Sequence, residues 1–133
     1  MCQGLLRKHN EKQTTLKALL TETPDSRYAA DAKFQLGETN IILENDGEAL
    51  RYYTMVTQQH PNSPLVRQAM LQTALIHKRM GNVDQAIADF KAVVSKYRTA
   101  EGSRDALAGL KNIYIELGRV ADYEAYIRTL EFI

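Results

Sequence analysis

Hydrophobic residues along this chain recur at steps of three and four positions, which is the spacing of one face of an α-helix. Between about 47 and 59 this spacing is carried by Tyr53 and Val56, among others. The same arrangement returns further along the chain at Phe90 and Val93. The pattern therefore predicts amphipathic helices and an all-α fold.

The helical pattern is repeated at a fixed interval. Pro61 follows Pro24 by 37 residues (61 − 24), and Ala69 follows Ala32 by the same offset. A further step of 37 from Ala69 reaches Ala106. Because the offset holds without a gap over successive copies, we interpret the chain as an internal repeat of one structural unit.

Each unit is predicted to fold as two helices joined by a short turn. In the first complete unit the helices are expected from about 27 to 43 and from about 47 to 59. Each turn contains a glycine, a residue that accepts a left-handed backbone without steric cost. These glycines are Gly47, Gly81 and Gly118.

Proline and serine separate one unit from the next. Proline lacks the amide donor that a helix needs, so Pro24 and Pro61 are expected to end the second helix of a unit. Ser26 and Ser63 stand two residues later, where a side-chain oxygen can cap the next helix. The third unit has no proline here, but the stretch YRTAEGSRDAL still supplies Thr, Gly and Ser before its first helix.

The repeat divides the single predicted domain, 1–133, into a half repeat and three full repeats. The half repeat is 1–23, and the full repeats are 24–60, 61–97 and 98–133. Because the half repeat matches a second helix without its partner, we interpret the chain as a fragment of a longer repeat protein. The alternative is a free-standing N-terminal cap.

Small residues, aromatic residues and proline occupy characteristic places within the unit: Gly37, Ala74, Ala49, Ala86, Tyr53, Phe90 and Pro61. With these residues the chain resembles the tetratricopeptide repeat (TPR), whose usual unit has roughly 34 residues. The linker, of the form proline-x-serine-x-x-alanine, resembles the variety found in bacterial cell-envelope proteins. The third unit departs from the pattern, since Lys111 and Tyr123 replace its small residue and its alanine.

The resemblance implies a right-handed α-solenoid of stacked antiparallel helical hairpins, with about seven helices. It also implies a non-enzymatic scaffold that binds a peptide or partner helix on its concave face. The linkers favour a periplasmic or envelope-associated assembly over a cytoplasmic one. The alternatives are a structural spacer or dimerisation segment, with a homodimer formed through the N-terminal helix, and an accessory domain of a larger enzyme or transport complex.

By the same resemblance, the first helix of each unit lines the concave side and carries the predicted partner-binding groove. Its positions recur at intervals of 37: Asp31, Phe34, Glu38 and Ile41, then Gln68, Leu71, Leu75 and Lys78, then Asp105, Ala108, Asn112 and Ile115. For Phe34, Leu71 and Leu75 the alternative role is core packing between repeats.

Composition and motifs argue against several other functions. The formal net charge is +1, so no overall electrostatic field would attract nucleic acid. The histidines, His9, His60 and His77, are too far apart in sequence to suggest a metal site. No phosphate-binding loop or catalytic constellation is apparent, and we therefore expect no cofactor and no enzymatic activity.

The remaining features concern disulfides and membranes. The single cysteine, Cys2, allows no intramolecular disulfide and is taken as incidental. No apolar run approaches the roughly 20 residues that a membrane-spanning helix needs, so no transmembrane segment is expected.

Overall fold

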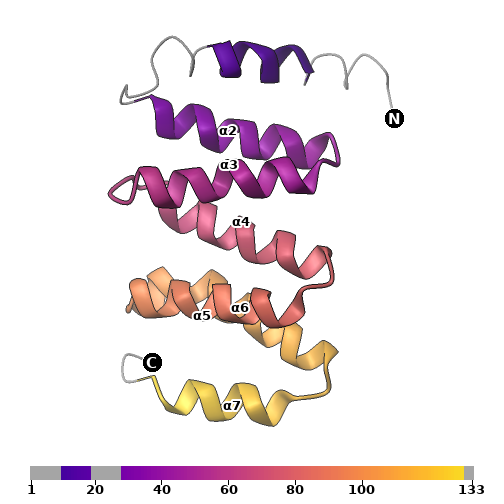
Figure 1. Ribbon diagram of the computed structural model, residues 1–133. Coiled ribbons are helices and arrows are strands. Elements are labelled where there is room, and N and C mark those ends of the chain that lie inside the picture. Colours follow the sequence, from indigo (N-terminus) through magenta and orange to yellow (C-terminus); the bar gives the residue numbers. More distant parts are fainter. Residues whose placement is uncertain (1–9, 19–27, 131–133) are drawn as a thin grey trace. The chain divides into compact units, whose positions relative to one another are not determined.

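The computed structural model describes residues 10–18 and 28–130, and these residues form helices without any strand (Figure 1). A helix at 10–18 is followed by α2 (Ala29–Ile42), α3 (Asp46–Gln59), α4 (Val66–Arg79), α5 (Val83–Lys96), α6 (Ala100–Glu116) and α7 (Val120–Arg128). The predicted all-α, TPR-like fold with about seven helices is thus confirmed for the described residues. Cys2, His9, Pro24 and Ser26 lie outside them.

The chain divides into two compact units, Met1–Ala69 and Met70–Ile133. In the first unit, α2 and α3 pack against each other as an antiparallel hairpin. Leu36, Tyr53 and Val56 are fully buried in it. Tyr53 and Val56 are positions that the three- and four-residue spacing assigns to the inner face of this helix.

The N-terminal helix at 10–18 contributes to the core of the first unit through Leu16. Leu16 is buried in a cluster with Ala32 and Leu36 of α2 and with Tyr52 of α3. This contact removes apolar surface of the hairpin from water, which is the main favourable term in helix packing.

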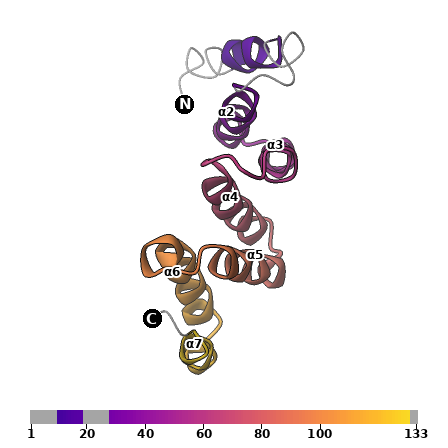
Figure 2. The same cartoon turned by 90° about the vertical axis from the view of Figure 1, so that its left-hand side faces the viewer.

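In the second unit, α6 packs against both α5 and α7 (Figure 2). The core of this unit consists of Leu71, Ala74, Ala86, Phe90, Val93, Val94, Ala106, Leu107, Leu110, Ile113 and Tyr114. None of the residues in α7 is fully buried, although Tyr123, Tyr126 and Ile127 pack against this core. Helix α7 therefore covers the core with one side and leaves the other side exposed.

The turns inside the three hairpins share one backbone geometry. The amides of Asn45, Asn82 and Arg119 donate to the carbonyls of Asn40, His77 and Tyr114 at 2.8, 2.8 and 2.7 Å. In each turn the residue before the donor has a positive φ: 59° at Glu44, 88° at Gly81 and 68° at Gly118. The expected glycine role is therefore confirmed at Gly81 and Gly118 but is wrong at Gly47, which lies inside α3. The reason is that α2 ends at Ile42, which places Glu44 at the left-handed position.

Side-chain oxygens satisfy backbone amides at the starts of α4 and α6. Ser63 Oγ accepts from the amide of Leu65 at 3.1 Å, just ahead of α4. At α6 the cap is Thr99, whose Oγ1 accepts from the amide of Gly102 at 2.9 Å. The third unit thus starts its first helix with threonine even though it lacks the linker proline.

Candidate partner-binding face

The predicted groove residues of the first unit lie on α2, and we call them the α2 face: Asp31, Phe34, Glu38 and Ile41. Asp31 and Glu38 are exposed, whereas Phe34 and Ile41 are half-buried. Phe34 packs edge-to-face against Tyr53 of α3, with 5.4 Å between the ring centroids. The α2 face therefore combines two exposed carboxylates with two partly accessible apolar side chains.

Tyr53 reaches the α2 face from the neighbouring helix. A Cβ atom at Gly37 would lie only 2.7 Å from Cζ of Tyr53, so the tip of the ring rests directly on the glycine backbone. The ring is fully buried, and the hydroxyl has no hydrogen-bond partner among the described residues. Burial, with a smaller contribution from Glu38, raises the pKa of the Tyr53 phenol well above its usual range. The phenol therefore stays neutral at physiological pH.

The predicted groove residues of α4 have different environments. Leu71 is only 6% exposed and belongs to the core of the second unit, so its alternative role as a core residue fits the structure. Leu75, one turn further on, is 43% exposed. Gln68 and Lys78 are half-buried. Of the four predicted positions on α4, Leu75 is therefore the one with an exposed side chain.

All four predicted positions on α6 are exposed, and we call them the α6 face: Asp105, Ala108, Asn112 and Ile115. Ile115 is 50% exposed. Next to it, Glu116 accepts from Lys78 Nζ at 3.2 Å, which joins the ends of α4 and α6. Both partners of this ion pair are solvent-accessible, so it contributes little to stability. It does hold a charged pair beside the exposed Ile115.

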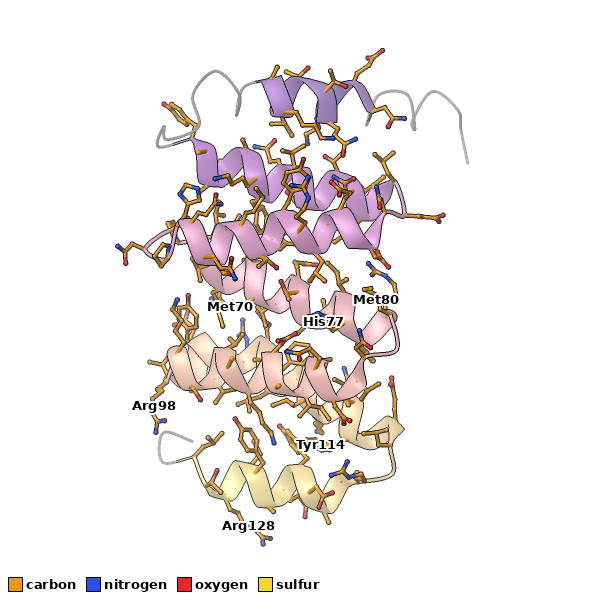
Figure 3. The ribbon with its side chains drawn as sticks, viewed as in Figure 1. Met70, His77, Met80, Arg98, Tyr114 and Arg128 are labelled. Carbon is orange, nitrogen blue, oxygen red and sulfur yellow. The ribbon has the colours of Figure 1, made fainter. Side chains whose placement is uncertain are left out.

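Two polar clusters lie near the ends of the hairpins rather than on these faces. In the second unit, Figure 3 labels His77 on α4. Its Nδ1 lies 2.5 Å from Asp89 Oδ2, and Gln85 donates to the other oxygen of Asp89. In the first unit, Lys33 is buried, and its Nζ donates to Gln59 at 2.5 Å and lies 2.9 Å from His60 Nε2. The first cluster ties α4 to α5, and the second ties α2 to the end of α3.

Neither cluster forms a recognisable metal site. No group of three or more His, Cys, Asp or Glu residues able to hold a metal ion occurs in the described part of the chain. Among the helices that the structure describes, none is long and apolar enough to cross a bilayer.

Residue spacing predicts that Tyr53 packs inside the hairpin, and its ring does so. The spacing does not predict that the Tyr53 hydroxyl has no hydrogen-bond partner among the described residues. The equivalent residue one repeat later is Phe90 (90 − 53 = 37), which has no hydroxyl. An aromatic ring, and not its hydroxyl, is therefore the feature that the two repeats share at this position.

One segment of the chain matches a known family of helical repeats. Residues 68–100 match the family model described as tetratricopeptide repeat. The matched segment contains most of α4 and all of α5, which is one helical hairpin. A search of curated proteins found no match. The helical fold and the family match together support a TPR protein, a class that typically acts in protein–protein interaction without enzymatic activity.

Proposed function

We propose that this chain is a non-enzymatic interaction module, or scaffold, that binds a peptide or partner helix on the exposed faces of its first helices. The observation that carries the proposal is the division of α6 into two sides. Its predicted groove positions are all exposed, whereas Ala106, Leu107, Leu110 and Ile113 of the same helix are buried in the core. Helix α6 thus completes the core with one side and leaves the other side exposed to solvent.

The chemistry of these faces suits a peptide better than a small polar ligand. Leu75 and Ile115 are among the most exposed large hydrophobic residues described, and the Lys78–Glu116 ion pair joins the helices that carry them. Apolar surface bordered by charged groups is typical of protein interaction sites. We also place the module in a bacterial envelope-associated assembly, on the resemblance of its proline–serine linkers alone.

The proposal is tested by selecting binders from a library of random twelve-residue peptides on the immobilised chain. Selected peptides are then titrated against a double variant of the α6 face, Ala108→Glu with Ile115→Glu. The matched control is Ala88→Glu with Ala92→Glu, which adds the same charges at exposed positions of α5. Circular dichroism verifies that both double variants remain folded.

We expect peptides that lose at least tenfold in affinity on the α6 face variant, or at least threefold on a variant of the α2 face such as Glu38→Gln, and that keep their affinity for the α5 control. A library without binders, or binders that ignore the variants of both faces, would contradict the proposal. Either result would favour the structural spacer or dimerisation role.

A further inference from the structure

Tyr53 carries a buried polar group that the fold itself does not use. Its hydroxyl is enclosed, and no donor or acceptor among the described residues pairs with it. Folding removes such a group from water without replacing the lost hydrogen bonds, which destabilises the native state. An unsatisfied group in a native structure therefore calls for an explanation.

The next repeat shows that an aromatic ring at this position can pack closely without a hydroxyl. Phe90 occupies the equivalent position, and its ring tip rests on Gly109 of α6, where a Cβ atom would lie 2.5 Å from Cζ of Phe90. The glycine under Phe90 belongs to the following hairpin, whereas Gly37, under Tyr53, belongs to the same hairpin as Tyr53. Both rings fill a close helix contact, and only one of them carries a hydroxyl.

The surroundings of the Tyr53 hydroxyl belong to the α2 face. Gly37 lies beneath the ring tip, Phe34 packs against the ring, and the charge of Glu38 acts on the phenol. Phe34 is half-buried and in contact with the Tyr53 ring, so it is a partly solvent-accessible side chain of the α2 face that reaches Tyr53.

The charge of the α2 face limits what it can bind. The ionisable residues of α2, all of them described, are Asp31, Lys33 and Glu38. Both carboxylates are exposed, whereas Lys33 is buried against Gln59 and His60. The α2 face is therefore acidic, with apolar surface from Phe34 and Ile41 between and beside its carboxylates.

We propose that the α2 face binds an extended peptide segment that carries a basic side chain next to apolar ones, and that the Tyr53 hydroxyl donates a hydrogen bond to a backbone carbonyl oxygen of that segment. The basic side chain pairs with Glu38, and an apolar side chain packs against Phe34. This inference rests on the proposed function, since it specifies the partner of one of the two faces.

The electrostatics of the site favour an uncharged acceptor, such as a peptide carbonyl, for the hydrogen bond from Tyr53. Burial and the nearby Glu38 carboxylate raise the pKa of the Tyr53 phenol, so it remains an O–H donor. The same carboxylate repels an anionic acceptor such as a peptide C-terminus. A backbone carbonyl accepts the hydrogen bond without adding negative charge.

The test uses the full chain and the peptides selected from the random library on the wild type. Each peptide is titrated by fluorescence polarisation against Tyr53→Phe and Glu38→Gln. The matched controls are Tyr52→Phe, which removes a phenol one residue away, and Glu124→Gln, which removes an exposed carboxylate on α7. Melting temperatures are recorded for all four variants.

We expect peptides rich in Lys or Arg to lose about three- to tenfold in affinity on Tyr53→Phe, the effect of one hydrogen bond. Glu38→Gln should weaken the same peptides, and the two controls should not. The melting temperature of Tyr53→Phe should stay equal or rise, because the variant removes an unsatisfied group.

Three results would overturn the inference while leaving the proposed function intact. The first is a set of peptides that Glu38→Gln weakens but Tyr53→Phe does not. The second is selection of acidic peptides only. The third is a clear fall in the melting temperature of Tyr53→Phe, which would show that the hydroxyl already has a stabilising partner. A library that yields no binder at all would instead contradict the proposed function itself.

Discussion

Glu44, Gly81 and Gly118 have the same left-handed backbone, at equivalent positions of three successive turns. Glycine accepts this conformation freely, whereas a residue with a Cβ atom pays roughly 1–2 kcal/mol for it. Glu44 is thus a strained residue in the turn between α2 and α3. Position 44 lies 37 residues before Gly81, so the repeat predicts the left-handed residue of the first turn at Glu44. The glycine nearest to this turn, Gly47, instead suggested position 47.

Replacing Glu44 with glycine should stabilise the protein. We expect Glu44→Gly to raise the free energy of unfolding by about 0.5–1 kcal/mol, the relief of strain less the added freedom of the unfolded chain. The converse change, Gly81→Ala, should lower it by about 1 kcal/mol. Urea denaturation measures both. A destabilised Glu44→Gly variant would show that the Glu44 side chain has a role beyond the turn.

The raised pKa of the Tyr53 phenol should make the free energy of unfolding depend on pH in alkaline solution. Its pKa is raised in the folded protein, so above the ordinary tyrosine value of about 10 the unfolded chain releases its proton first. The free energy of unfolding is therefore unaffected by Tyr53 below pH 10 and falls above it, by up to about 1.4 kcal/mol per pH unit. The free energy of unfolding of the wild type and of Tyr53→Phe is measured by denaturation between pH 8 and 11. The difference between the two proteins separates the contribution of Tyr53 from that of other titrating groups. Parallel curves for the two proteins would contradict it.

At the scale of the helices, most of the structure follows from periodicity. The helices expected from about 27 to 43 and from 47 to 59 are observed as Ala29–Ile42 and Asp46–Gln59. Periodicity could not separate Leu71 from Leu75, because both lie on the same side of α4 one turn apart. Leu71 enters the core and Leu75 does not. That difference depends on which helices cover each turn, which the sequence pattern does not encode.

The register of α5 can be tested at Ala86, which is fully buried in the core of the second unit. Ala86→Arg would bury an unpaired charge at a close helix contact, and we expect a loss of roughly 3–5 kcal/mol. Ala92→Arg places the same side chain on the exposed side of α5 and should change stability by less than about 0.5 kcal/mol. Thermal denaturation compares the two variants. Equal melting temperatures would mean that the two sides of α5 are assigned wrongly.

At the scale of the whole molecule, the chain has 17 basic and 16 acidic residues, and specific recognition must therefore come from local surfaces. The α2 face of the first unit is acidic, whereas in the second unit the exposed Leu75 and Ile115 accompany a neutralised ion pair. The helices and their repetition could be predicted from residue spacing, and the TPR-like arrangement from the resemblance to that family. The contrast between the two faces could not, because it depends on the burial of Lys33 and Leu71 and on the pairing of Lys78.

The central claim is that partners bind to the first helix of each hairpin. The most direct test is to add a library-selected peptide to the ¹⁵N-labelled chain and to map the changes in amide chemical shift. We expect the largest changes along α2, α6 or the C-terminal part of α4. Changes confined to α3, α5 and α7 would contradict the account and would place binding on the second helices.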